Sequence, residues 1–119
     1  MRFLGLVRSA EGQGVPPAGL MEAMAGFIEA SLRDGSLVQT GGLAPGSAAV
    51  RIRQSGGRLY VTDGPFIETK ELIGGYAILE ATSREAAIEI MHKFMELHER
   101  HWPAWQGECE LREMVFVTP

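Results

Sequence analysis

Two stretches of this chain are apolar on both sides of an extended strand, and this feature limits how the chain can fold. Residues 2–8 place Phe3 on one face and Leu4 on the other, and residues 73–80 repeat the pattern with small or apolar side chains. Strands that are apolar on both sides belong inside a sheet that is covered on both faces. The fold must therefore supply cover for two sides of one sheet.

Two helices are predicted, and both are amphipathic. The first spans about 18–33, with apolar residues at i, i+4, i+7, i+8 and i+12, and Asp34-Gly35 ends it. The second begins after Ser83, a favourable N-cap residue, runs to about Glu99 and is stopped by Trp102-Pro103.

The remaining segments read as strands and turns. Short strands are expected at 37–40, 49–53 and 58–62, with the turn Ser55-Gly56-Gly57 making a hairpin of the last two. Residues 63–72 read as irregular, and 108–117 as the last strand. The whole chain, 1–119, is expected to be one domain.

Two helices can cover only one face of such a sheet. A chain of 119 residues has no further element for the other face, so an identical sheet from a second subunit is the economical cover. The sequence therefore predicts an α+β, ferredoxin-like unit that forms a homodimer through its sheets, a dimeric α+β barrel. A cleft is expected between helices and sheet in each subunit.

Composition excludes several classes of partner. The net charge of −4 argues against nucleic acid or an anionic membrane as the main partner, because both need a basic face. No apolar run approaches the length of a membrane span, and no signal peptide is apparent. Cys109 is the single cysteine, so no disulfide within the chain is expected. Together, these features predict a soluble, cytoplasmic protein. No cofactor motif stands out. His98 and His101, at i and i+3, lack a visible third metal ligand.

The most distinctive motif is Asp63-Gly64-Pro65-Phe66, followed by Glu68, Lys70-Glu71 and Gly74-Gly75-Tyr76. With these residues the chain resembles the DGPF proteins of the YCII-related family. The resemblance covers nearly the whole chain, including Gly42-Leu43-Ala44-Pro45 and Glu110-Leu111-Arg112. It implies a dimeric α+β barrel and says little about activity, since most members have no assigned reaction. Such proteins are often companions of extracytoplasmic-function sigma factors.

The resemblance also has a gap. Some YCII-related proteins are thought to use a histidine near the start of the first helix with an aspartate near its end. Here Met24 occupies the region of that histidine, and only Asp34 remains. The dyad is therefore not expected in this chain.

Asp63, Glu68 and Lys70 are candidate site residues with two interpretations each. Asp63 either caps a rigid turn that places Phe66 in the core, or serves as an acid/base group at the mouth of the cleft. Glu68 and Lys70 either form ordinary surface ion pairs or line the rim of a site for a small polar ligand.

The helical wheel separates the histidines. His92 lies among glutamates on the exposed face, whereas His98 lies in the apolar stripe near Met91 and Phe94. His98 is therefore either a bonded core residue or a base that faces the cleft.

Aromatic residues are the last candidates. Trp102 and Trp105 are either packing residues or an aromatic wall for a flat ligand, and Tyr76 is either a packing residue or a hydroxyl donor into the cleft.

Two classes of function follow. The favoured class is a small-molecule-binding or accessory module in which Glu68, Lys70, Tyr76 and Trp102 contact the ligand, and the resemblance implies an association with sigma-factor regulation. The alternative is an enzyme that acts on a small polar organic molecule, with Asp63 and His98 as acid/base groups.

Overall fold

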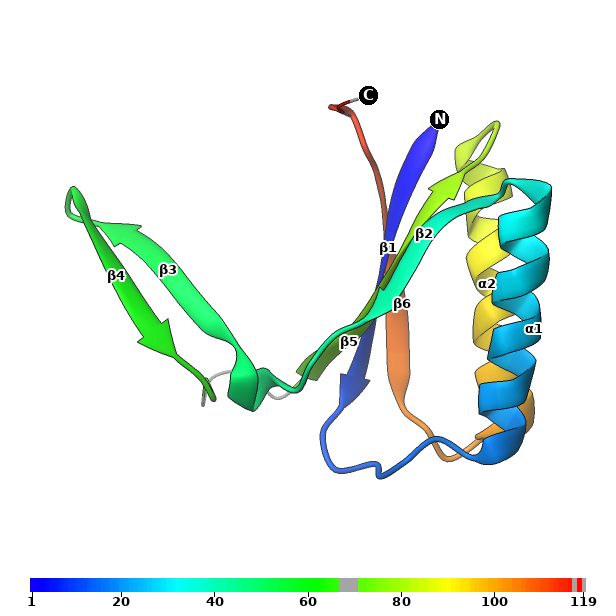
Figure 1. Cartoon of the computed structure of the whole chain (residues 1–119), viewed down its shortest axis with the longest axis horizontal. Helices are drawn as coiled ribbons and strands as arrows, with labels where there is room; N and C mark the ends of the chain where they lie inside the picture. The colour runs from blue at the N-terminus through cyan, green and yellow to red at the C-terminus, as the bar shows by residue number, and fades with distance from the viewer. Residues whose placement is uncertain (67–70, 117, 119) are drawn as a thin grey trace.

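The computed structural model describes residues 1–66, 71–116 and 118, and in this part of the chain two helices cover one side of an antiparallel sheet (Figure 1). The main sheet has the strand order β2-β5-β1-β6, and β3 and β4 form a separate two-stranded ribbon. This architecture is compatible with the predicted ferredoxin-like α+β fold. The elements are β1 (Arg2–Ala10), α1 (Ala18–Asp34), β2 (Leu37–Gly42), the 3-10 turn η1 (Gly46–Ala48), β3 (Val50–Ser55), β4 (Arg58–Asp63), β5 (Glu71–Glu80), α2 (Arg84–His101) and β6 (Gly107–Glu113).

The two strands with apolar residues on both faces, β1 and β5, lie at the centre of the main sheet, as predicted. Their antiparallel register pairs Phe3 with Leu79 and Leu4 with Ile78. Phe3 and Leu79 face the helices and are only 3% and 1% exposed. Leu4 and Ile78 point to the other side and are half-buried. We call that side, which also carries Leu6, Tyr76 and Glu110, the open face of the sheet.

Local capping explains where the helices begin and end. The α1 helix ends at Asp34 because Gly35 takes the left-handed conformation, at φ 84°. Hydrogen bonds from the Ser36 side chain and from its backbone N–H, the latter at 2.8 Å, lower the pKa of the Asp34 carboxyl. At the start of α2, the Ser83 hydroxyl oxygen accepts a hydrogen bond from the Ala86 N–H at 3.1 Å.

The core lies between the helices and the sheet. The rings of Phe27 on α1 and Phe94 on α2 pack with their centroids 5.9 Å apart. Beneath them, apolar side chains of the sheet and α2 form one cluster, to which Cys109 adds a half-buried thiol whose pKa burial raises to about 11. The buried members of the cluster are Phe3, Leu37, Ala77, Leu79, Ala81, Ala87 and Met91.

Four details differ from the predictions. The last strand, β6, ends at Glu113, and β5 already begins at Glu71 within the segment expected to be irregular. Every residue of β3 and β4 is exposed, although β3 was expected to be half exposed. Phe66 is half-buried outside the main core, with the Arg51 guanidinium 3.7 Å from its ring centroid.

Truncation of Leu79 tests this core. We expect Leu79→Ala to lower the free energy of unfolding by roughly 2–5 kcal/mol, because it removes a buried side chain and leaves a cavity. Leu32→Ala, at a position 49% exposed on α1, is the matched control and is expected to cost less than about 1 kcal/mol. Chemical denaturation of the two variants gives the comparison, and equal losses would contradict this assignment of the core.

Candidate functional site

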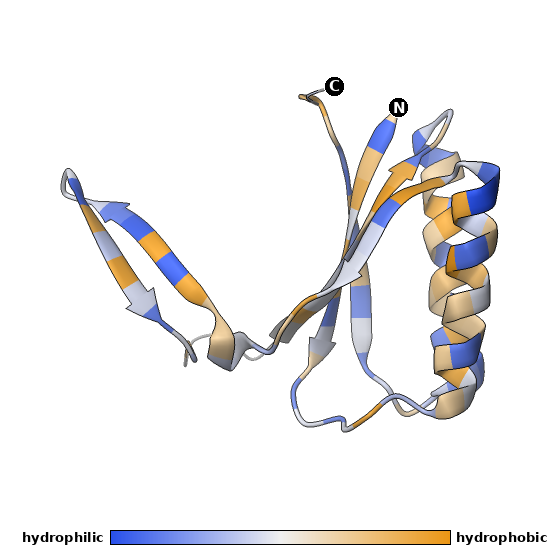
Figure 2. Ribbon diagram, viewed as in Figure 1, coloured by the Kyte–Doolittle hydropathy of each residue, from blue (hydrophilic) through white to orange (hydrophobic). Residues whose placement is uncertain are grey.

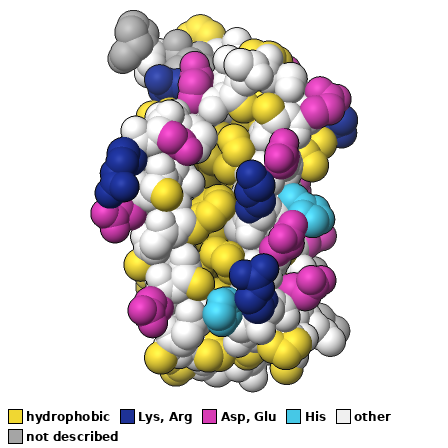
Figure 3. All heavy atoms as spheres, turned by 90° about the vertical axis from the view of Figure 1, so that its right-hand side faces the viewer, with side chains coloured by type: hydrophobic (Ala, Val, Ile, Leu, Met, Phe, Trp, Pro, Cys, Tyr) yellow, Lys and Arg dark blue, Asp and Glu magenta, His cyan; other side chains and the backbone are white. Residues whose placement is uncertain are grey.

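A cavity of about 640 Å³ lies between the two helices and the helix-facing side of the main sheet. Figure 3 shows apolar side chains running between the helices over this region. Several lining residues are exposed, among them Met21, Ala25 and Gly42, so solvent reaches the cavity. Its size and mainly apolar lining are typical of small-molecule sites.

Glycines on two neighbouring strands leave room for the cavity. Gly42 on β2 pairs with Gly75 on β5, and Gly75 in turn pairs with Val7 on β1. All three residues line the cavity, as does Gly74 next to them. Because glycine has no side chain, the sheet leaves space beneath the helices where larger residues would fill it. The glycine pairs therefore shape the cavity.

Two loops meet at one end of the cavity. The Gln13 side-chain amide donates hydrogen bonds to the backbone oxygens of Ala10 and Gln106, at 2.9 and 2.8 Å. Its side-chain oxygen accepts one from the Gln106 N–H at 2.6 Å. These bonds hold the β1–α1 loop against the α2–β6 loop, which carries Trp102 and Trp105. Both tryptophans line the cavity.

His98 is the buried titratable group of the cavity lining. It lies in the last turn of α2 and is 7% exposed. Its ring lies between two aromatic rings, with centroids 5.0 Å from Phe94 and 4.5 Å from Trp105. Its Nδ1 is 3.3 Å from the Phe94 carbonyl oxygen. A carbonyl oxygen only accepts, so Nδ1 carries the proton in the neutral ring and Nε2 is left as an acceptor.

Burial sets the protonation state of this imidazole. Loss of solvation lowers the pKa of His98, and the bond to the Phe94 carbonyl opposes this effect only in part. The ring is therefore neutral at physiological pH. A neutral acceptor in an apolar cavity can bind an O–H or N–H donor of a ligand, or can accept a proton.

Ser31 and Thr40 add hydroxyl groups to the lining, and the sequence analysis missed both. The Thr40 hydroxyl donates to the Tyr76 backbone oxygen at 2.7 Å, so its proton is engaged. Ser31 is 6% exposed, and its backbone oxygen accepts a hydrogen bond from the Ser36 hydroxyl at 3.4 Å. Ser31 belongs to the inward face of α1 together with Leu20, and that helical spacing is the signal that could have identified it.

The structure separates the predicted site residues. His98 and Trp102 line the same cavity. Asp63 does not line it: it ends β4 on the exposed ribbon, paired with Val50. Glu68 and Lys70 lie outside the described residues. Thus Asp63 and His98 are not brought together.

Tyr76 borders the cavity, but its register with Leu6 sends the side chain to the open face. There the ring lies against Gly41, whose position would not accept a Cβ without displacing the ring. The Tyr76 hydroxyl is therefore directed away from the cavity, whereas the Tyr76 backbone oxygen bonds Thr40.

The other two histidines lie elsewhere. His92 is exposed, and its Nδ1 lies 2.6 Å from the Glu96 carboxylate, which agrees with the predicted exposed face. His101 packs against Gly19 at the start of α1 and does not line the cavity. Only His98, among the three, is therefore a candidate for contact with a ligand there.

Within the described ranges no group of three histidine, cysteine, aspartate or glutamate side chains is placed to hold a metal ion. Among the same residues, no helix has the length and apolar character to span a membrane.

Comparison with known proteins identifies the family. The family model of the YCII-related domain matches residues 1–96, and the chain belongs to this family. The chain is also similar to an uncharacterized protein of Rhizobium meliloti (strain 1021), with 38% identity over 93 residues, which are 78% of this chain and 68% of that protein. His98, Trp102 and Trp105 follow the matched range, so the family match does not extend to the aromatic end of the cavity.

The neutral state of His98 predicts how stability depends on pH. The folded-state pKa is lowered, so the folded protein binds a proton less readily than the unfolded chain. Stability is therefore fully present above the unfolded pKa, near ~6.5, and is lost as pH falls through that value toward the folded one.

Denaturant unfolding between pH 8 and pH 5 gives the measurement. His98→Gln is expected to flatten the profile, while His92→Gln, at an exposed position, keeps it. A wild-type imidazole of His98 that titrates by NMR as it does in a model peptide would contradict its burial.

Proposed function

We propose that the protein is a small-molecule-binding module whose ligand occupies the cavity between the helices and the sheet. The observation that carries this proposal is the buried, neutral His98 between two aromatic rings in the cavity lining. Ligand sites commonly combine an apolar lining with a few placed polar groups, and the Nε2 of His98 and the Ser31 hydroxyl meet that description.

The lining indicates the ligand class. The aromatic residues Phe94, Trp102 and Trp105 favour a flat molecule. The apolar residues around them favour a molecule that is mostly uncharged, which differs from the small polar ligand expected from the sequence. The acceptor on His98 favours one O–H or N–H donor on the ligand. A flat, neutral aromatic alcohol or amine fits these three requirements.

Acid/base catalysis is the second candidate, and the lowered pKa of His98 favours it. An unprotonated imidazole in a mainly apolar cavity can take a proton from a bound ligand. His98 would then act without Asp63, which ends the exposed ribbon. A ligand that stabilises the protein and is never consumed supports the binding module over the enzyme.

The accessory role beside sigma factors stays a prediction. No observation on the described residues bears on it, and a two-hybrid assay against sigma factors encoded beside the protein's gene is the appropriate test.

We also propose that two copies associate through the open face of the main sheet. Leu4, Leu6 and Ile78 are half-buried there in a single chain, and Ile73 is 40% exposed. Stacking of two such faces would remove this apolar surface from water.

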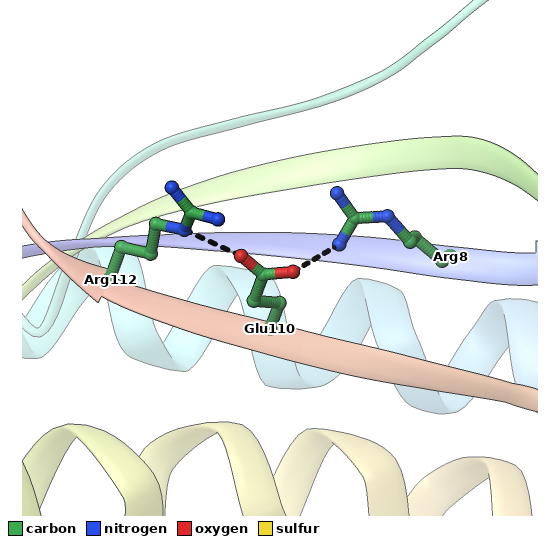
Figure 4. Close-up of polar contacts among 3 residues, drawn as sticks. All are labelled: Arg8, Glu110 and Arg112. Atoms are coloured by element: carbon green, nitrogen blue, oxygen red, sulfur yellow. Dashed lines mark hydrogen bonds and ion pairs between the residues drawn. The ribbon is translucent and has the colours of Figure 1, made fainter.

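The β6 side of the open face carries an ion network that supports this interface (Figure 4). Glu110 accepts hydrogen bonds from Arg8, at 2.6 Å, and from Arg112. The bond and charge of Arg112, with the nearby Arg8, lower the pKa of Glu110. These charges are already paired within one chain. Contact between two open faces would therefore bury fewer unpaired charges than the sequence alone suggests.

Binding of three matched probes tests the ligand class: 2-naphthol, 2-methoxynaphthalene and naphthalene. We expect 2-naphthol to bind about tenfold more tightly than the other two, because only its O–H can donate to His98, a gain of about 1.4 kcal/mol. His98→Phe keeps a ring between Phe94 and Trp105 but removes the acceptor, so the preference should disappear. His101→Phe, at a position outside the cavity, should retain it. Equal affinity of the wild type for all three probes, or no binding of any, would overturn the assigned ligand class.

Light scattering tests the sheet interface. The wild type is expected to have about twice the chain mass of 13.0 kDa at micromolar concentration. Ile78→Lys should give a folded monomer, with dimer affinity lowered on the order of 100-fold, because the interface would bury an unpaired charge. Ile88→Lys, at an exposed position of α2, should remain dimeric. A monomeric wild type would refute this interface.

A further inference from the structure

The ribbon formed by β3 and β4 lacks cover within one chain. Its residues are all exposed, and among the described elements β3 and β4 make extensive contacts only with each other. The ribbon projects from the main sheet on the side opposite to the helices (Figure 1). An isolated two-stranded hairpin is marginally stable at best in water. The ribbon therefore needs a surface to pack against.

One face of the ribbon is mainly apolar, with Gln54 and Asp63 at its two ends. The register pairs Ile52 with Val61 and Gln54 with Leu59, and Val50 lies on the same face two residues before Ile52. The side chains of Ile52, Leu59 and Val61 are 70%, 69% and 69% exposed. Figure 2 shows the resulting alternation of hydrophobic and hydrophilic residues along the ribbon. We call these four residues, Val50, Ile52, Leu59 and Val61, the arm face.

The opposite face of the ribbon is polar and has contacts of its own. Arg53 lies over the ring of Tyr60, with 5.9 Å to the centroid, and Arg51 lies over Phe66. These stacked arginines give the ribbon a solvent-compatible side. The arm face is therefore the side that needs a partner.

Charge indicates the kind of partner. Residues 50–63 carry three arginines and one aspartate, whereas the rest of the chain carries eight basic and fourteen acidic residues. A basic, half-apolar ribbon is thus attached to an acidic body. The arginines lie outside the arm face, so they would attract the acidic body of a second copy without being buried against it, and that copy brings an open sheet face that is also uncovered.

We propose that the β3–β4 ribbon is an arm that packs on a second copy of this chain. Its arm face contacts the partner when the two open sheet faces meet. This inference rests on the proposed sheet dimer. Because the ribbon extends on the open-face side, a partner stacked on that face lies next to it (Figure 1). With two-fold symmetry, each subunit contributes one arm and one surface that accepts the partner's arm. The assembly is therefore a closed dimer.

Dimer affinity, measured by sedimentation equilibrium, tests the arm. The double variant Ile52→Thr/Val61→Thr keeps β-branched residues in the ribbon and removes much of its arm face. We expect it to raise the dimer dissociation constant by at least about tenfold. Tyr60→Thr, on the opposite face of the same ribbon, should leave it within about twofold of the wild type. Since all three positions are exposed in one chain, circular dichroism should show each variant folded.

Hydrogen exchange supplies an independent measurement. Ribbon amides should be protected in the concentrated wild type and exchange rapidly in the monomeric Ile78→Lys variant. If the double variant dimerises as tightly as the wild type and the ribbon amides exchange rapidly in the dimer, the arm is refuted while the sheet interface stands. Ribbon protection that persists in the monomer also refutes the arm, since the ribbon would then pack on its own chain. If the double variant weakens the dimer and Ile78→Lys does not, the copies do not meet through their open faces, and the sheet interface and the arm that rests on it are both refuted.

Discussion

The structure depends on one mismatch: the two central strands of the main sheet carry apolar residues on both sides, and the two helices cover only one side. Phe3 and Leu79 lie under the helices and are almost fully buried, whereas their neighbours Leu4 and Ile78 remain half-buried on the open face. Burial of apolar area contributes roughly 25 cal/mol per Å², so an uncovered face of this kind favours association. The proposed dimer and the proposed arm both follow from this one constraint.

The helix side of the same sheet has a different character. Glycines at positions 42, 74 and 75 leave a cavity beneath the helices, and α2 brings His98 to it between two aromatic rings. A cavity in a core costs stability, because its lining loses van der Waals contacts. Ligand binding would explain why the cavity is kept despite this loss of stability. A flat molecule bound there would restore van der Waals contacts to the lining residues.

Much of this fold could be predicted from local sequence. Ser83 and Gly35 mark helix ends by side-chain and backbone chemistry that acts within a few residues, and the helical wheel placed His92 outside and His98 inside. The ends of β5 and β6 could not be predicted so well, because they are set by pairing with β1. This pairing joins residues that are far apart in the sequence. Tyr76 looked like a candidate for the cleft. Which face it takes depends on the register with Leu6, and a shift of one residue would reverse it. The cavity itself comes from glycines on separate strands, which only the assembled sheet brings together.

The central claim is that a second copy of the chain covers the open face, and intermolecular NOEs test it most directly. A sample mixed from ¹³C-labelled and unlabelled chains reports only contacts between subunits when isotope-filtered spectra are recorded. The account predicts intermolecular NOEs to the methyl groups of Leu4, Leu6 and Ile78, and none to the methyl of Ala87, which lies in the core under α2. A dimer whose intermolecular NOEs arise from the outer faces of the helices, with none from the open face, would contradict it.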